Sequence, residues 1–110
     1  EIAYLYEPHH PAVIRSLKRV FEVGEEHGVA VTVCGEIAGD PHFLPLLLAL
    51  GVNSLSAASP MLPELKFFAR RFTLAEAQDL LDRIRIMKRP SEINQSLKDF
   101  YEERVSDLIS

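Results

Sequence analysis

One cysteine lies between an apolar run and a loop of small and acidic residues. Cys34 follows the run 29–33, and the loop 35–41 after it reads GEIAGDP. In parallel α/β proteins, reacting groups gather at the carboxyl ends of strands. Because a free thiol has a pKa of about 8.5 and is mostly protonated at neutral pH, Cys34 could donate a proton. A lone buried cysteine is more often a small hydrophobic residue, and this alternative stays open.

The loop after Cys34 has the composition of an anion-binding segment. Gly35 and other small residues let the backbone approach a ligand, and Asp40 followed by Pro41 predicts the start of a helix. Backbone N–H groups and a helix N-terminus would meet there, which suits an anionic substrate. Glu36 could orient that ligand or only cap the loop.

The four histidines lie in contexts that favour structural roles. His9 and His10 flank a proline turn, His27 lies near a predicted helix C-terminus, and His42 lies in the first turn of another helix. A single cysteine excludes an internal disulfide and a multi-cysteine zinc site. A thiol-redox enzyme that uses Cys34 remains an alternative, although it lacks a second cysteine.

Helices and short strands alternate in the elements that must position Cys34. A helix is predicted from Pro11 to a stop at Gly28. Its apolar face comprises Val13, Ile14, Leu17, Val20, Phe21 and Gly24. The run 29–33 predicts a strand buried on both faces, and 54–58 predicts a weaker strand. Between them, a helix over 43–50 is apolar all round, so we expect it to be deeply packed.

Three helical stretches follow. The first covers 63–72, and the second is opened by a capping box at Thr73 and Glu76. The apolar side of the second consists of Leu74, Ala77, Leu80, Leu81 and Ile84. The last helix is capped by Ser91, with Ile93, Leu97, Phe100, Tyr101, Val105 and Leu108 on one face. This order predicts an α/β fold with parallel strands. Two strands make a poor sheet, so we expect an excised piece of a larger protein with exposed edges.

Composition excludes several classes of protein. The chain has 110 residues, enough for one domain, and its 47% hydrophobic and 25% charged residues are ordinary for a globular protein. Twelve Lys and Arg against sixteen Asp and Glu give a net charge of -4, which argues against nucleic-acid binding. No apolar run approaches the roughly 18 residues of a membrane span. The N-terminus shows no secretory signal, so a cytoplasmic location is predicted.

One motif is specific enough to suggest a family. The segment 33–41, VCGEIAGDP, followed by LPLLL at 44–48 and Gly51, closely resembles the active-cysteine segment of the phosphoenolpyruvate-utilising enzymes. Within them it is most similar to the phosphoenolpyruvate-protein phosphotransferase family, enzyme I of the bacterial phosphotransferase system. The resemblance extends back through 5–8 and 10–13, and forward through 53–58 to 62–63. It implies the last two βα units of a TIM (β/α)8 barrel over 1–72, with a C-terminal helical extension over 73–110.

The resemblance also implies an activity. The family moves the phosphoryl group of phosphoenolpyruvate to a histidine and on to a histidine-containing phosphocarrier protein, with Mg²⁺ required. Cys34 would then be the general acid that protonates enolpyruvate to pyruvate, with Gly35 and Glu36 as weaker candidates for substrate contacts. In the family, the ligands of Mg²⁺ and of the substrate phosphate lie upstream. We therefore expect no metal ligand in this chain and no activity from it alone.

Other interpretations stay open. A pyruvate phosphate dikinase has a similar motif, and the motif does not separate a sugar branch from a nitrogen-regulatory branch. The family's C-terminal domain forms homodimers, so the last helix is expected to pack on the barrel or to join two subunits. A non-enzymatic helical dimerisation module is the alternative from a different class.

Overall fold

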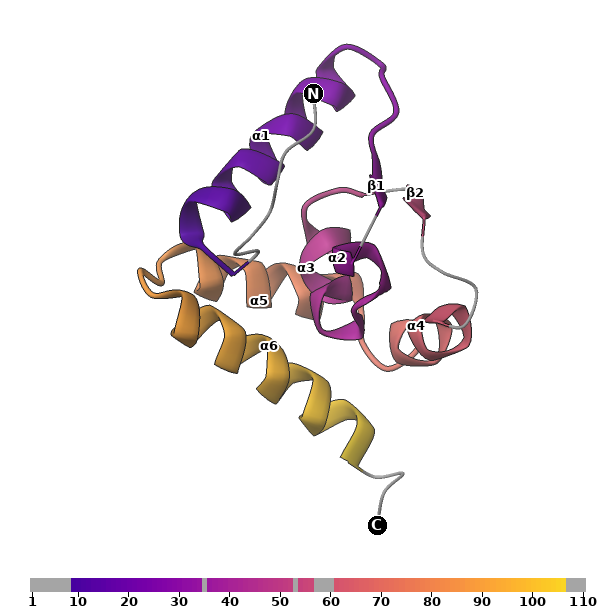
Figure 1. The fold of residues 1–110 in the computed structure, drawn as a ribbon, viewed down its shortest axis with the longest axis vertical. Helices are drawn as coiled ribbons and strands as arrows, with labels where there is room; N and C mark the ends of the chain where they lie inside the picture. Colours follow the sequence, from indigo (N-terminus) through magenta and orange to yellow (C-terminus); the bar gives the residue numbers. More distant parts are fainter. Residues whose placement is uncertain (1–8, 35, 53, 57–60, 107–110) are drawn as a thin grey trace.

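The fold consists of helices and one short, two-stranded parallel sheet (Figure 1). The computed structural model describes residues 9–34, 36–52, 54–56 and 61–106, and of 32, 34, 36 and 54–56 it describes the backbone alone. In chain order the elements are α1 (Pro11–Glu26), β1 (Thr32–Cys34), α2 (Glu36–Gly39), the 3-10 helix η1 (Pro41–Phe43), α3 (Leu44–Ala49), β2 (Ser54–Ser56), α4 (Leu62–Ala69), α5 (Leu74–Arg85) and α6 (Pro90–Val105). The predicted alternation of helices and parallel strands is confirmed.

Helix α1 begins and ends as its sequence predicts. The N–H of Ala12 donates to Nδ1 of His10 at 3.0 Å, and Gly28 adopts a φ of 66° just past the helix end. The buried stripe contains Ile14 and Phe21, but Val20 is 50% exposed, so its predicted place on the apolar face is wrong. Val20 precedes Phe21 by one residue and is therefore turned about 100° around the helix from the stripe.

Strand β1 is shorter and less buried than predicted. It covers Thr32–Cys34 rather than 29–33, Val29 is 61% exposed, and Val33 is half-buried. The prediction of burial on both faces is therefore wrong. Such burial needs strands on both sides, and the described residues place only β2 beside β1. Strand β2 covers Ser54–Ser56, and the rest of its predicted range, 57–58, lies outside the described residues.

The connection from β1 to β2 is more helical than predicted. Residues 36–39 form α2 instead of a loop, because one turn of helix buries Ile37 and Ala38, while Gly35 and Gly39 hide this preference in the sequence. The next helix begins at Pro41 as η1 and continues as α3, with the N–H of His42 donating to Asp40 Oδ1 at 3.0 Å. The predicted cap at Asp40 is confirmed. Residues 44–47 are all buried, as expected of a helix without a polar face.

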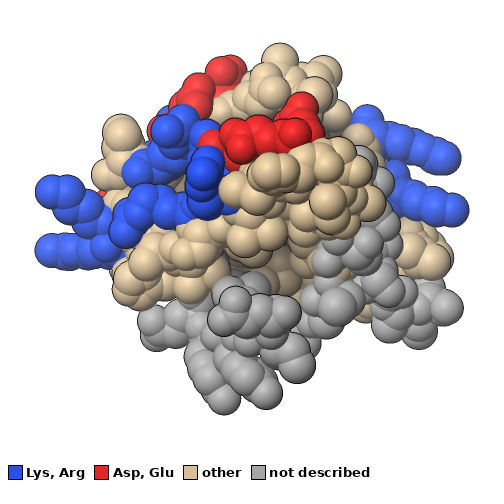
Figure 2. Space-filling view, turned by 90° about the horizontal axis from the view of Figure 1, so that it is seen from above, with Lys and Arg blue, Asp and Glu red and all other residues tan. Residues whose placement is uncertain are grey.

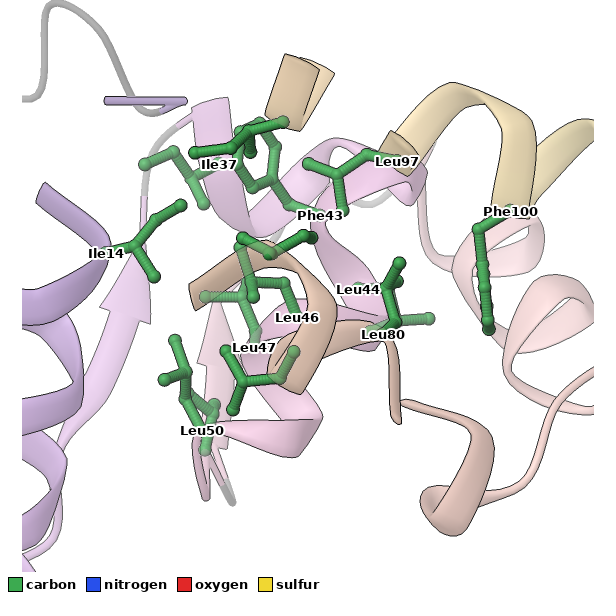
Figure 3. Packing of buried hydrophobic residues seen from close by; sticks show 14 of the residues in the cluster. Ile14, Ile37, Phe43, Leu44, Leu46, Leu47, Leu50, Leu80, Leu97 and Phe100 are labelled. Carbon is green, nitrogen blue, oxygen red and sulfur yellow. The ribbon is translucent and has the colours of Figure 1, made fainter. Parts of the chain in front are cut away.

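The hydrophobic core lies between α3 and the helices that surround it (Figure 3). Leu46 and Leu47 of α3 and Leu80 of α5 are at most 1% exposed. Helix α6 adds Leu97 and Phe100 from a second side. The apolar side of α5 thus covers α3, and that of α6 packs on η1, α4 and α5.

The boundaries of the last three helices correct three predictions. Helix α4 covers Leu62–Ala69 rather than 63–72. Leu74 is 56% exposed despite its place in the periodicity, because this first residue of α5 is not covered by the elements that bury the rest of its apolar side. Helix α6 begins at Pro90 with Arg89 as the N-cap residue, not Ser91. Proline lacks an N–H and has a fixed φ, so it fits the first helical position.

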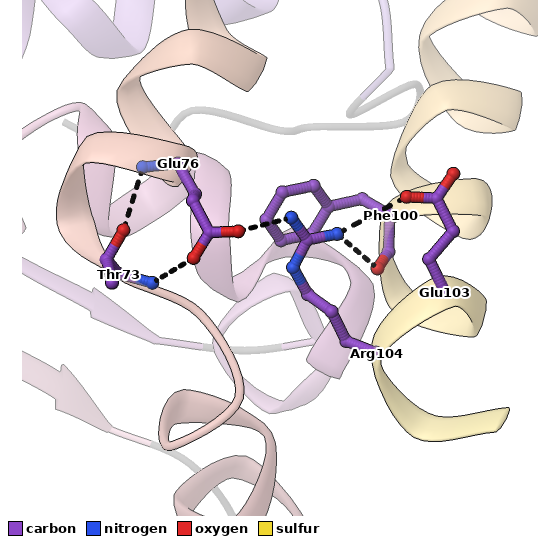
Figure 4. Close-up of polar contacts among 5 residues, drawn as sticks. All are labelled: Thr73, Glu76, Phe100, Glu103 and Arg104. Carbon is purple, nitrogen blue, oxygen red and sulfur yellow. Dashed lines mark hydrogen bonds and ion pairs between the residues drawn. The ribbon is translucent and has the colours of Figure 1, made fainter. Parts of the chain in front are cut away.

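Arg104 joins α6 to the start of α5 (Figure 4). Its Nη2 donates to Glu76 Oε2 at 2.8 Å, and its guanidinium carbon lies 3.5 Å from the ring centroid of Phe100. Glu76 also closes the predicted capping box, in which the N–H of Thr73 donates to Glu76 Oε1 at 2.9 Å and the N–H of Glu76 donates to Thr73 Oγ1 at 3.1 Å. One carboxylate therefore caps α5 and holds α6.

Candidate active site

Cys34 is the last residue of β1 and lies in register with Ser56, the last residue of β2. The strands are parallel, so the chain leaves both of them at the same edge of the sheet. This arrangement confirms the predicted place of Cys34 at the carboxyl end of a parallel strand. Reacting groups of α/β proteins collect at such an edge.

The segments that follow the two strands meet at this edge. Helix α2 starts at Glu36, two residues after Cys34, and is anchored by the buried side chains of Ile37 and Ala38. A Cβ on Gly39 would lie 3.6 Å from Cγ of Met61, which comes just before α4. The segment after β1 therefore lies close to the segment after β2 at Gly39 and Met61. Gly35 lies outside the described residues, and its predicted substrate contact, like that of Glu36, stays a prediction.

A chain of polar side chains extends from this segment to α6 and α4. His42 Nδ1 lies 3.0 Å from Asp40 Oδ1, and the imidazole packs on the ring of Tyr101 at a centroid distance of 4.6 Å. The hydroxyl of Tyr101 donates to Glu64 Oε1 at 3.2 Å. Burial, together with the nearby Glu64 carboxylate, raises the pKa of Tyr101. We call Asp40, His42, Tyr101 and Glu64 the polar chain.

The sequence did not predict the polar chain, because its members lie far apart along the sequence. Asp40 and Glu64 each carry an ordinary local signal, as a cap and as a first-turn carboxylate. The spacing of Tyr101 predicts only membership of an apolar face. No local pattern indicates that this ring meets His42, which requires α6 to fold back on η1.

His9 and His10 have structural contacts in this part of the molecule. His10 caps α1, and the ring of His9 packs on Phe43 at a centroid distance of 4.8 Å. Burial lowers the pKa of His9, and the negative charge of Asp40 opposes this shift only in part. His9 is therefore held in its neutral form more than an exposed histidine would be.

The described residues do not provide a site for a metal ion. Among them, no three His, Cys, Asp or Glu side chains lie close enough together to hold one. These residues therefore do not fit Mg²⁺ on their own. In the same part of the chain, no helix combines the length and the apolar character that crossing a membrane requires.

Comparison with known proteins identifies the family. Residues 1–74 match the family described as PEP-utilising enzyme, PEP-binding domain. The chain belongs to this family. The match runs through β1, β2 and α4, and it ends at the first residue of α5. The predicted resemblance to phosphoenolpyruvate-utilising enzymes is thereby confirmed.

Individual relatives are similar to the chain over most of its length. It is 33% identical over 103 residues, 94% of the chain, to an Escherichia coli K12 protein named phosphoenolpyruvate-dependent phosphotransferase system. It is 40% identical over 88 residues, 80% of the chain, to the phosphoenolpyruvate-protein phosphotransferase of Chlamydia trachomatis serovar D, and 31% identical over 104 residues, 94% of the chain, to that of Latilactobacillus sakei. The chain spans only 14%, 15% and 18% of these three relatives.

Proposed function

We propose that this chain is the C-terminal part of the phosphoenolpyruvate-binding domain of a phosphoenolpyruvate-protein phosphotransferase, and that Cys34 is the general acid of its reaction. One observation carries the proposal. Cys34 lies at the carboxyl end of a parallel strand, inside the segment that matches the phosphoenolpyruvate-binding family. The names of the similar proteins support the reaction, and the position of the cysteine supports its role.

The thiol completes the chemistry that phosphoryl transfer begins. When the bond between phosphorus and the enol oxygen breaks, the phosphoryl group passes to a histidine and leaves enolpyruvate. The electron pair of the enolate then forms a bond from the methylene carbon to the proton of Cys34 Sγ–H, which gives pyruvate and a thiolate. Solvent returns the proton to sulfur. In the reverse direction the thiolate removes a proton from the methyl group.

The fold extends this proposal beyond the chain. We infer that β1 and β2 with their helices are the last two units of a (β/α)8 barrel, whose other strands would pair with β1 and cover the exposed Val29. The family match ends close to residue 72, the boundary expected between the barrel units and the C-terminal helices. Helices α5 and α6 would form the extension through which two subunits associate.

The remaining groups would come from the rest of the protein. No three metal-ligating side chains lie together among the described residues, which supports our inference that the ligands of Mg²⁺ belong to preceding barrel units. The phosphorylated histidine would belong to another domain, and the acceptor would be a histidine-containing phosphocarrier protein. Gly35 and Glu36 would contribute to the substrate side of the site from the loop that follows Cys34.

The substitution Cys34→Ala tests the proposal in the full-length protein. Since general acids contribute about 100- to 10,000-fold to rates, pyruvate formation from phosphoenolpyruvate should fall at least about 100-fold. The protein should keep its circular dichroism spectrum, because alanine is smaller than cysteine and equally apolar. Wild-type turnover by a folded Cys34→Ala protein would remove Cys34 from the mechanism.

A further inference from the structure

The C-terminal helix α6 reaches back to the segment that follows Cys34. Tyr101 of α6 lies beyond residue 74, where the family match ends, yet its ring packs on His42 in η1. The two rings are 4.6 Å apart between centroids and inclined by 49°. A residue outside the matching segment therefore contacts the segment that follows Cys34.

The contact continues in both directions as hydrogen bonds. On one side His42 Nδ1 lies 3.0 Å from Asp40 Oδ1, the same oxygen that accepts the backbone N–H of His42 at 3.0 Å. On the other side the hydroxyl of Tyr101 donates to Glu64 of α4 at 3.2 Å. The side chains of Asp40 and His42 are 41% and 36% exposed. The ring of Tyr101 thus packs on His42 at a partly exposed place that the hydrophobic core does not cover.

The polar chain is separated from Cys34 by the short helix α2, whose Ile37 and Ala38 are buried. Helix α2 lies between Cys34 and Asp40, and Ile37 and Ala38 are 8% and 1% exposed. Packed interiors transmit displacements because they contain little free space. Because α2 contacts both η1 and β1, a shift of Asp40 would be passed through α2 to the end of β1.

We propose that Tyr101 is a positioning residue for the reaction: by packing on His42 it holds Asp40, and through α2 it holds the backbone at Cys34 in the geometry that proton transfer needs. This inference rests on the function proposed above. The ring carries the effect, and the hydroxyl bond to Glu64 fixes the orientation of the ring.

Steady-state kinetics of the full-length protein test this inference with four single variants and the double variant Tyr101→Ala/His42→Ala. Tyr101→Ala removes the ring, Tyr101→Phe keeps it, and His42→Ala removes the other half of the contact. Ile93→Ala is the matched control, because Ile93 is fully buried on the same helix but lies eight residues, about 12 Å, from Tyr101. For each protein, kcat for pyruvate formation, KM for phosphoenolpyruvate and Tm are measured.

The positioning role predicts a specific pattern. Tyr101→Ala and His42→Ala should each lower kcat about 10-fold, since small misplacements of a reacting group cost up to about 100-fold, and KM should change little. The double variant should lose no more than either single variant, because both remove one contact. Tyr101→Phe should keep most of kcat, and Ile93→Ala should lower Tm and leave kcat unchanged.

Each other outcome overturns the inference. If Tyr101→Ala behaves like Ile93→Ala, with a lower Tm and an intact kcat, its role is structural only. If Tyr101→Ala does not fold, His42→Ala decides alone, since this half-exposed residue can be removed at little cost to the core. Cys34→Ala distinguishes failure of the proposed function from failure of this inference. Wild-type turnover by Cys34→Ala would overturn both. Slow turnover by Cys34→Ala, together with a wild-type kcat for His42→Ala, would overturn this inference alone.

Discussion

Cys34 and Ser56 are register partners at the last positions of β1 and β2, and the chain leaves both strands at one edge. The segments beyond them come together where Gly39 packs against Met61. The edge is thus built from two parts of the chain that are both inside the family match. We therefore expect the chemistry at this edge.

The reactivity of Cys34 separates an acid catalyst from a redox thiol. An acid catalyst should be protonated at pH 7, so alkylation by iodoacetamide should be slow and should rise about 10-fold per pH unit up to about pH 8.5. Trypsin releases Cys34 as the only cysteine of the peptide 20–66, in which mass spectrometry measures the label. Fast alkylation that is already constant at pH 7 would favour the redox alternative.

Glu76 should make stability depend on pH. The N–H of Thr73, and then Arg104, lower the pKa of the Glu76 carboxyl in the folded protein. The contribution of Glu76 to the free energy of unfolding is therefore complete above the ordinary glutamate pKa. It is lost as pH falls through the lowered pKa of the folded protein. Urea unfolding from pH 7 to pH 3 should show this loss, and Glu76→Gln should reduce it.

The exposed Glu102 of α6 is the matched control for Glu76. It forms no ion pair among the described residues, so Glu102→Gln should leave the pH dependence of the free energy of unfolding as it is in the wild type. If the free energy of unfolding depends on pH equally in Glu76→Gln and in the wild type, the charge of Glu76 does not stabilise the fold through the capping box or the Arg104 ion pair.

Gly24, the glycine of α1, should be difficult to replace. A Cβ at this position would lie 2.6 Å from Cγ2 of Val31 and 3.0 Å from the carbonyl oxygen of Val29. Gly24→Ala gains up to about 1 kcal/mol in helix propensity, but we expect the clash to exceed this gain and to lower the free energy of unfolding by about 1–3 kcal/mol.

Gly39→Ala provides the comparison for Gly24→Ala. Its Cβ would meet Met61 at 3.6 Å, an ordinary contact, so the free energy of unfolding should change by less than that of Gly24→Ala. Urea unfolding of both variants measures the difference. Equal stability of the two would mean that α1 does not pack on the chain before β1 as closely as described.

Features that depend on neighbouring residues could be predicted from the sequence. The Asp40 cap, the Thr73–Glu76 capping box and the stop at Gly28 each follow from a residue and its local hydrogen bonds. Helix α2 was missed because four residues that include a glycine carry little helical signal, and its stability comes from burying Ile37 and Ala38.

Features that depend on distant contacts could not be predicted in this way. The exposure of Val20 and Val29 depends on which elements cover them, and the spacing of apolar residues in the sequence does not predict those elements. The same holds for the candidate site. The place of Cys34 follows from the alternation of strands and helices, but the meeting of His42 with Tyr101 follows from the path of α6.

Exchange of the methyl protons of pyruvate in D2O tests the role of Cys34 most directly. The full-length protein is mixed with phosphoenolpyruvate, pyruvate and Mg²⁺, so that transfer runs in both directions, and proton NMR follows the methyl signal. If Cys34 moves the proton to and from carbon, the wild-type protein should accelerate exchange, and Cys34→Ala should exchange at the rate of a sample without protein. Exchange by Cys34→Ala at the wild-type rate would contradict the account.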